Sequence, residues 1–440
     1  MIRIIAAIHA LLLALAPVSA PAQLTHAERS MTTLVDRESE RSVALLARLV
    51  DQNSGSLNAA GVEKVGAIMR AELEPLDFAV RWVPMTETGR GGHLIATHRG
   101  DGPGTKMLLI GHLDTVFEPD SPFQRFERQG MRATGPGVGD DKGGMVVMLA
   151  ALRAMQVAGT LRRADIEIVL TGDEEDVGNP VEIARRDLIA AGRRADVALD
   201  FEGLAREDGK DMGSVARRSS GNWEVRTTGR GGHSSSIFSA AAGDGAIFEL
   251  ARILAAFRTE LPEPDLTFNV GLVAGGESAS LDPAGILAAA GGKTNIIAGI
   301  AVARGDIRTL TLEQNERVVA KMRAIVARHL PGTGADIMFG SDSYPPMAPT
   351  PGNIALLARL NRVNRDLGLA EMAPLDPLKR GAGDIGFVAH LLDGLVGLGA
   401  AGEGAHAPGE SVDLSSIPLQ AKRAAILMSR LARETPARRD

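Results

Sequence analysis

The chain has 440 residues, of which 45% are hydrophobic and 23% are charged, a composition typical of a globular protein. One compact core seldom uses that many residues, so we expect two domains. The formal net charge of −6 argues against a surface for nucleic acid or for an anionic membrane. The chain has no cysteine, which excludes disulfides, lipid-modified cysteines and thiolate ligands, so any metal must be held by His, Asp and Glu.

Residues 1–22 have the pattern of a secretory signal peptide, with one Arg, an apolar stretch and then small residues suited to a signal peptidase. We expect cleavage after Ala22, because cleavage after Ala20 would leave Pro21 directly behind the cut. No other segment is apolar for long enough to span a membrane. The sequence therefore predicts an exported protein, periplasmic or secreted, whose mature form has no membrane anchor.

Apolar strands and amphipathic helices alternate in the first half of the mature chain. Helices are predicted at 31–50 and 61–76, and strands follow at 78–84 and 91–100. Continuous apolar runs in "TKMLLIGHLD", "ADIEIVLTGDEE" and "ADVALDFEG" are typical of strands buried on both faces, and helices fall between them. This alternation predicts an α/β fold with a doubly wound, mixed sheet that is mostly parallel at its centre.

The order of elements changes at residue 221. Up to residue 345 the pattern reads strand, helix, two strands, helix and strand, which fits a small ferredoxin-like α+β domain. From residue 346 to residue 440 the α/β pattern returns. We therefore predict one α/β domain formed by residues 23–220 and 346–440, with residues 221–345 inserted as a second domain.

Histidine and acidic residues stand at the ends of the three buried strands. In open α/β sheets the carboxyl ends of parallel strands meet at one edge, where ligands bind. Two glycine-rich loops, "GPGVGDDKGG" and "GEGAHAPGE", add two aspartates and a histidine. The residues expected to converge are His112, Asp114, Asp140, Asp141, Glu174, Glu175, Glu202 and His406. Two histidines with several carboxylates suit zinc, and a carboxylate shared between two ions suits a pair about 3.5–4 Å apart.

Each of these features also has a simpler explanation. His112 alone fits a hydrogen-bonded strand end, and "DEE" alone fits a solvated acidic turn. In "DDKGG" an aspartate fits the N-cap of a helix, and His406 alone indicates little. Their order along the chain and their place at strand ends favour a common site, which independent accidents rarely produce.

The motifs together resemble metallopeptidase family twenty, which includes bacterial glutamate carboxypeptidases, aminoacylases and succinyl-diaminopimelate desuccinylases. They are "GHLDTV", "GPGVGDDKGG", "TGDEE", "LDFEG", "GRGGHSSS", "GDIR", "GAGD" and "GEGAHAPGESVDL", between residues 108 and 414. The chain is most similar to glutamate carboxypeptidases in "DDKGG", "DEE" and the pair Phe201-Glu202. The resemblance implies an α/β catalytic domain with an inserted ferredoxin-like domain that serves as dimerisation (lid) domain.

The resemblance also implies two Zn²⁺ per subunit, held by five residues: His112, Asp140, Glu175, Glu202 and His406. Asp140 would bridge the ions, with His112 and Glu202 completing one site and Glu175 and His406 the other. Members of the family often have a cis peptide bond after the bridging aspartate, here between Asp140 and Asp141.

Catalytic roles follow from the same resemblance. Glu174 would be the general base, and Asp114 would orient the imidazole of a metal-binding histidine. His233 of "GGHSSS" would stabilise the oxyanion, typically in the partner subunit's site of a homodimer, although it also fits a polar turn. Arg308 and Asn295 would bind a free carboxylate of the substrate, although Arg308 also fits a surface ion pair.

Amide hydrolysis is the expected activity, releasing a C-terminal amino acid such as glutamate from a peptide or N-acyl amino acid. Gly383 of "GAGD" stands where the most similar members often have a threonine that contacts substrate. The alternatives are an N-acyl-amino-acid deacylase or dipeptidase and, from another class, an exported protein that binds peptides or metal without catalysis. Branches of the family that use a cysteine ligand are excluded by composition.

Overall fold

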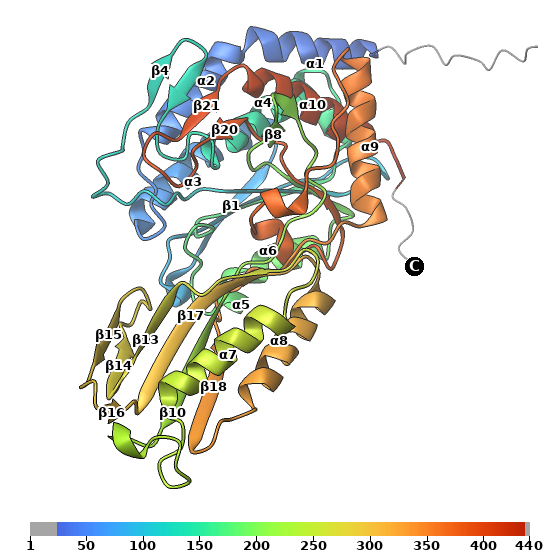
Figure 1. Cartoon of the computed structure of the whole chain (residues 1–440). Helices are drawn as coiled ribbons and strands as arrows, with labels where there is room; N and C mark the ends of the chain where they lie inside the picture. The colour runs from blue at the N-terminus through green and yellow to red at the C-terminus, as the bar shows by residue number, and fades with distance from the viewer. Residues whose placement is uncertain (1–23, 436–440) are drawn as a thin grey trace, which may run out of the picture.

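A six-stranded mixed sheet forms the centre of the larger part of the molecule (Figure 1). The computed structural model describes residues 24–435. Its strands lie in the order β1 (Ala79–Pro84), β2 (Gly92–His98), β6 (Ile166–Thr171), β3 (Met107–His112), β7 (Val197–Asp200) and β19 (Asp393–Leu395). The strands β6, β3, β7 and β19 run parallel, whereas β2 is antiparallel to both of its neighbours. The predicted doubly wound, mixed sheet is confirmed.

Helices cover both faces of this sheet. One face packs against α1 (His26–Arg37), α2 (Ser39–Val50), α3 (Ala59–Leu73), α4 (Lys142–Val157), α9 (Pro351–Asp366) and α10 (Ser416–Leu431). The other packs against α5 (Val181–Ala184), α6 (Arg186–Gly192) and the 3-10 helix η6 (Asp384–Phe387). Successive residues of a strand point to opposite faces. Leu109 of β3 thus enters one core and Leu108 and Ile110 the other, which explains why the run is apolar throughout.

A second, antiparallel sheet forms the smaller part of the molecule, at the bottom of Figure 1. It consists of β13 (Leu272–Gly276), β17 (Ile300–Arg308), β10 (Gly221–Gly229) and β18 (Thr333–Phe339), in that order, and the short β12 (Thr267–Phe268) also pairs with β17. The helices α7 (Ala246–Glu260) and α8 (Leu312–Val326) pack on it and share its core. The chain order is βαββαβ, as the sequence predicts.

The strands of this second sheet differ in detail from the prediction. The run "LTFNVGLVAG" is divided between β12 and β13, and "NIIAGIAVARGDIR" between β16 (Ile296–Ile297) and β17. Two further pairs were not predicted. They are the hairpin of β14 (Ser278–Leu281) and β15 (Ala288–Gly291), and β11 (Gly232–His233) beside β16.

Several short strands flank the two loops that contain the predicted residues His406 and Asp140. β20 (Gly402–Glu403), β21 (Ser411–Asp413), β5 (Arg132–Thr134) and β4 (Glu127–Gln129) form a four-stranded sheet, and β8 (Arg206–Glu207) pairs with β9 (Lys210–Asp211). Because β21 pairs with β5, the loop between β20 and β21 is held close to the loop that follows β5. These loops contain His406 and Asp140.

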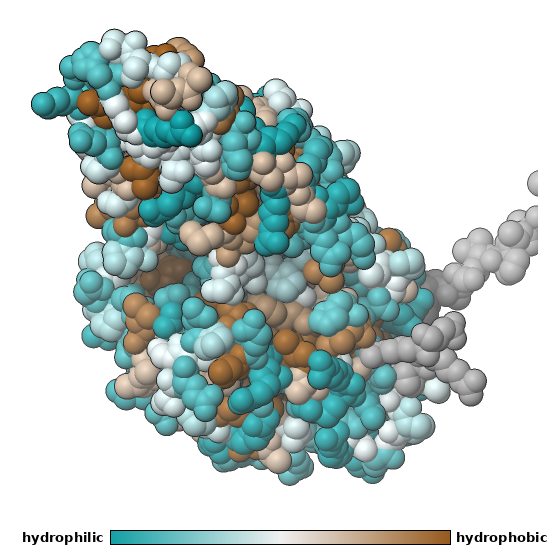
Figure 2. All heavy atoms as spheres, turned by 90° about the horizontal axis from the view of Figure 1, so that it is seen from below, coloured by the Kyte–Doolittle hydropathy of each residue, from teal (hydrophilic) through white to brown (hydrophobic). Residues whose placement is uncertain are grey.

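Most of the surface seen from below is hydrophilic, with hydrophobic residues scattered among the polar ones (Figure 2). Within residues 24–435, no helix combines the length and the apolar character that crossing a membrane requires. The predicted signal peptide, residues 1–22, lies outside the described residues.

Candidate metal centre

Three adjacent parallel strands bring the predicted residues to one edge of the larger sheet. His112 is the last residue of β3, Glu174 and Glu175 follow β6, and Glu202 follows β7. Both β6 and β7 pair with β3 in parallel, so their carboxyl ends lie side by side. The sequence predicts this convergence because the direction of each strand is fixed by the helical connections between them.

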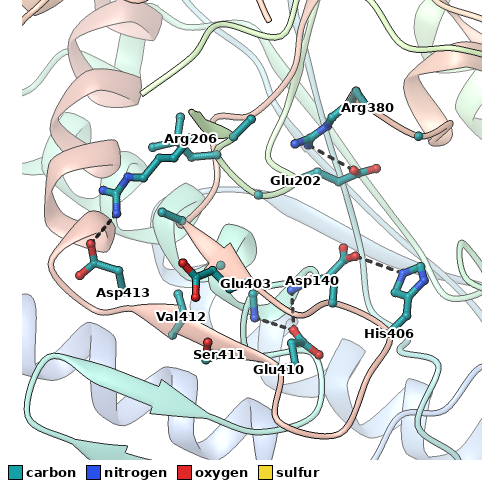
Figure 3. Close-up of a pocket in the computed structure, with 18 of the residues that line it drawn as sticks. Asp140, Glu202, Arg206, Arg380, Glu403, His406, Glu410, Ser411, Val412 and Asp413 are labelled. Atoms are coloured by element: carbon teal, nitrogen blue, oxygen red, sulfur yellow. Dashed lines mark hydrogen bonds and ion pairs between the residues drawn. The ribbon is translucent and has the colours of Figure 1, made fainter. Parts of the chain in front are cut away.

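Asp140 lies between two histidines. Its Oδ1 is 3.0 Å from Nε2 of His112, and its Oδ2 is 3.4 Å from Nε2 of His406 (Figure 3). Nε2 of His406 is also 3.0 Å from Oε2 of Glu175. Ligand atoms of His112, Asp140 and Glu175 all lie within 4.8 Å of one another. One carboxylate thus presents one oxygen to each imidazole, which is the arrangement that a carboxylate shared by two cations needs.

Asp114 holds both His112 and the segment that carries the two glutamates. Nδ1 of His112 is 3.2 Å from the carbonyl oxygen of Asp114 and 3.4 Å from its Oδ1. The buried Asp114 carboxylate accepts hydrogen bonds from the backbone N–H groups of Glu174 (3.0 Å) and Glu175 (3.1 Å). Ser56, which sequence reasoning missed, donates to it at 2.6 Å. Burial opposes ionisation of Asp114, but the hydrogen bonds with His112 and Ser56 keep its pKa below the usual value.

Burial and mutual hydrogen bonds raise the pKa values of the histidines and glutamates in this cluster. Hydrogen bonds to Asp140 and Glu175 raise the pKa of His406 to about 11. Burial lowers the pKa of His112, but hydrogen bonds with Asp114 and Asp140 outweigh burial, and the pKa lies well above the usual value. Burial raises the pKa of Glu175 to about 7 and holds the pKa of Glu174 well above its usual range.

Glu202 faces two arginines that sequence reasoning did not single out. Its carboxylate forms an ion pair with Nη1 of Arg217, and its Oε2 is 3.5 Å from Nη2 of Arg380 (Figure 3). Glu202 lines the same cavity as Asp140, but it is not part of the close group around His112. That Glu202 completes a metal site with His112 stays a prediction, and in the structure its carboxylate is paired with the two arginines. The motifs "VARRSS" and "LKRGAGD" contain these arginines and were the available signal.

Glu410 supports the loop that carries Asp140 and was also missed. Its carboxylate accepts hydrogen bonds from the backbone N–H groups of Gly137 (2.9 Å), Gly139 (2.8 Å) and Asp140 (3.0 Å), as Figure 3 shows in part. The peptide bond between Asp140 and Asp141 is cis, as the resemblance implied. Asp141 occupies the N-cap position of α4, as the simpler explanation of "DDKGG" expects, but its side chain makes no capping bond.

A buried cation lies behind the segment with the two glutamates. Arg185 is completely buried; its Nη1 is 2.5 Å from Oδ1 of Asp173, and its Nε is 2.7 Å from Oδ1 of Asp384. Its Nη2 donates to the hydroxyl of Tyr344 (2.7 Å), which in turn donates to the backbone oxygen of Glu174 (2.7 Å). This network, which the sequence did not predict, fixes the backbone from which Glu174 projects.

The three predicted site residues that fall within residues 221–345 lie elsewhere. His233 is exposed, with Nδ1 2.8 Å from Oγ of Ser235, and Asn295 accepts the backbone N–H of Ser234. Arg308 is bonded to Asp306, with Nε 3.3 Å from Oδ2. None of the three lines the cavity of about 1060 Å³ that is bounded by Asp140, Glu174, Glu202 and His406. Within residues 24–435 of one copy, the structure therefore does not bring them to the cluster.

A carboxylate–histidine cluster at the carboxyl ends of parallel strands, opening into a large cavity, defines the class of α/β proteins with a metal site. The particular family follows from sequence. Residues 108–430 match Peptidase family M20/M25/M40, and the chain belongs to this family.

Three known proteins illustrate the similarity. Carboxypeptidase G2 of Pseudomonas sp. (strain RS-16) is 27% identical over 289 residues, which cover 65% of this chain and 63% of that protein. A succinyl-diaminopimelate desuccinylase of Leptothrix cholodnii is 28% identical over 203 residues, 44% of this chain and 51% of that protein. The chain thus spans less than two thirds of the length of either relative. The solved structure of aminopeptidase PepT from Bacillus cereus is 20% identical, with a TM-score of 0.70 over 90% of this chain and 99% of that one, and shares the fold. Family and relatives indicate a metal-dependent hydrolase.

Proposed function

We propose that the protein is a di-zinc hydrolase that cleaves an amide bond and releases a C-terminal amino acid, in the manner of a carboxypeptidase. One observation carries the proposal: Asp140 presents one oxygen to His112 and the other to His406. Carboxypeptidase G2 among the relatives supports the direction of cleavage. The substrate would be a peptide or an N-acyl amino acid with a free carboxylate.

The residues present fit zinc. Two imidazoles and two carboxylates, those of His112, His406, Asp140 and Glu175, gather within ligand distances of one another and leave the cavity side open. We propose that Glu202 completes the set by exchanging its arginine partners for a cation. When bound, the cations polarise the amide carbonyl and lower the pKa of water to about 7.

The chain itself would move the protons. Glu174 follows β6 at the cavity wall and would accept the proton of the attacking water, then return it to the leaving amine. Burial raises the pKa of its carboxylate, so Glu174 holds a proton at neutral pH more readily than an exposed glutamate does. Asp114 would fix the ring of His112 and the backbone of Glu174 at once.

We further propose a homodimer in which His233 of a second copy reaches this cavity and stabilises the oxyanion. His233 is exposed and lies beside β16 in the pair of β11 and β16. The exposed rings of Phe238 and Phe248 lie 5.4 Å apart on the same domain, where an interface would cover them. Arg308 and Asn295 would bind a free carboxylate of the substrate. The signal sequence would direct the protein to the periplasm or the medium.

Two alternatives stay open to test. An N-acyl-amino-acid deacylase or dipeptidase uses the same centre, and the similarity to desuccinylases supports a deacylase as the second candidate. A non-catalytic peptide- or metal-binding protein is less favoured, because Glu174 and the predicted ligands are all present.

The decisive experiment combines metal analysis with a substrate panel. Purified protein is analysed for zinc before and after treatment with a chelator, and both samples are assayed on peptides and N-acyl amino acids that differ only in the C-terminal residue. We expect about two zinc ions per chain and hydrolysis that disappears with the metal and returns when zinc is added. Full zinc content without hydrolysis of any amide would refute the proposal and favour the binding protein.

A further inference from the structure

Arg380 has a guanidinium on the cavity wall with unused hydrogen-bonding capacity. Its side chain is 14% exposed and lines the cavity with Asp140 and Glu174. Its Nε is buried and has no hydrogen-bond partner among residues 24–435. Its contact with Glu202 is an ion pair of 3.5 Å, which is too long for a good hydrogen bond (Figure 3). A buried donor without an acceptor is unfavourable, so this group is poised for an anion.

The other arginine of this wall, Arg217, has more partners, although its Nη1 also lacks a hydrogen bond within residues 24–435. Arg217 donates from Nε to the backbone oxygen of Gly381 (2.7 Å) and from Nη2 to that of Ala382, and it holds Glu202 directly. Arg380 therefore shares a carboxylate that Arg217 already binds. If Glu202 turns to a metal ion, Arg380 loses the one carboxylate with which it forms an ion pair in the described chain.

Electrostatics supports the same conclusion. Arg380 and Arg217 place two positive charges against the single carboxylate of Glu202. A carboxylate beside Arg380 would relieve the repulsion between the two guanidinium groups and replace the water that burial has removed. An arginine offers a planar pair of donors that matches the two oxygens of a carboxylate.

Neighbouring positions do not offer an equivalent group. A side chain at Gly383 would collide with Arg217 and Glu202. Arg308 approaches the same loop, since a Cβ added to Gly381 would be 3.9 Å from its Nη1, but it does not line the cavity. Of the two arginines beside Glu202 in the described chain, Arg380 has the fewer partners, and its guanidinium faces the cavity with a donor unused.

We propose that Arg380 binds a carboxylate of the substrate at the cavity wall next to Glu202. This inference rests on the proposed function and adds a specificity-determining residue to it. The carboxylate comes either from the amino acid that is released or from the acyl part, and both sources present the same two oxygens to the guanidinium. Substrates that carry an amide in place of this carboxylate are rejected, because they leave the buried charge of Arg380 unpaired.

The test measures binding of reaction products, so it does not depend on turnover. Zinc-loaded parent, Arg380→Gln and Arg380→Lys are titrated by calorimetry with L-glutamate, L-glutamine, the α-amide of glutamate, and succinate. Lys379→Gln is the matched control, because Lys379 is adjacent, exposed and already paired with Glu207 at 2.6 Å. Thermal unfolding verifies that each variant is folded, and Arg380→Lys retains the charge if Arg380→Gln proves unstable.

We expect Arg380→Gln to weaken binding of at least one acid by about tenfold or more, Arg380→Lys to weaken it less, and Lys379→Gln to leave it within about twofold. If Arg380 binds one carboxylate of glutamate, the compound with an amide at that position binds equally to the parent and to Arg380→Gln, which identifies the carboxylate. If the variant weakens binding of succinate alone, Arg380 binds a carboxylate of the acyl part. Equal affinities in the parent and both Arg380 variants would overturn the inference, as would a parent that binds none of the acids at millimolar concentration. A parent that binds acids through Arg380 but hydrolyses no amide would leave this inference standing and remove the proposed function.

Discussion

Replacement of Arg185 by Met tests whether the network behind Glu174 is a main source of stability. The guanidinium is fully buried, forms two short ion pairs with Asp173 and Asp384, and lies 5.6 and 5.4 Å from the ring centroids of Tyr344 and Phe387. Methionine fills a similar volume, so the change removes the charge and leaves little cavity. Two buried carboxylates would then lack their cation.

The expected loss is large for one side chain. Breaking a buried ion pair by removing one partner costs about 3–5 kcal/mol, and the whole unfolding free energy of a protein is typically about 5–15 kcal/mol. We expect Arg185→Met to lower the free energy of unfolding by about 3–5 kcal/mol, with a smaller loss in Tyr344→Phe, which removes one hydroxyl.

Urea unfolding of the metal-free protein, followed by circular dichroism, measures this difference from the midpoint and slope of the transition. Arg128→Met is the control. Arg128, like Arg185, donates two hydrogen bonds to carboxylate oxygens, here both of Glu40, but it does so on the surface, where we expect little change in the free energy of unfolding. A loss below about 1 kcal/mol in Arg185→Met would refute the reasoning that this buried pair is essential.

Four further outcomes are expected. Glu174→Ala keeps its zinc but loses turnover by about 10²–10⁴-fold, because only the proton acceptor disappears; a parental rate would show that another group is the base. Zinc affinity rises with pH by about tenfold per pH unit for each proton that zinc displaces. The reason is that the pKa of His112 is raised well above its usual value and that of His406 to about 11, so zinc competes with protons for both imidazoles. Calorimetry at about pH 6–8 measures the slope, and an affinity that does not change with pH would contradict this prediction. Glu410→Gln weakens zinc binding by about tenfold or more in a chelator competition assay, because the loop that carries Asp140 loses a charged hydrogen-bond acceptor. Unchanged affinity would show that Glu410 is not needed to hold this loop in place. Sedimentation shows a dimer, and a fully active monomer would exclude a role of His233 across subunits.

The sequence predicts the core of the centre because it depends on strand order. His112 and Glu175 end or follow neighbouring parallel strands, and right-handed connections place those ends together without any knowledge of side chains. Asp140 was predicted by its glycine-rich loop, and the structure places it between the two imidazoles. The βαββαβ order of the second sheet follows from the same kind of pattern.

The long buried cations escaped prediction for a physical reason. Arg185, Arg217 and Arg380 each have at least one partner far away in the sequence; Arg185 and Asp384, for example, are 199 positions apart. The direction of such a side chain depends on tertiary contacts that periodicity does not encode. Arginine is mostly exposed in proteins, so a buried one is not the first expectation. The same limit explains Glu202, whose carboxylate turns toward two cations that the sequence analysis did not consider.

His112 and His406 lie on parts of the backbone that differ in secondary structure and in burial. His112 ends a central strand that is hydrogen-bonded on both sides, and its ring is fully enclosed. His406 lies on a loop, with a left-handed backbone (φ 64°) and a side chain that is 58% exposed. Amide hydrogen exchange should therefore be slow at one end of the centre and fast at the other. A metal ion bound at this centre would dissociate by losing His406 first, while His112 keeps its position and can bind the next ion.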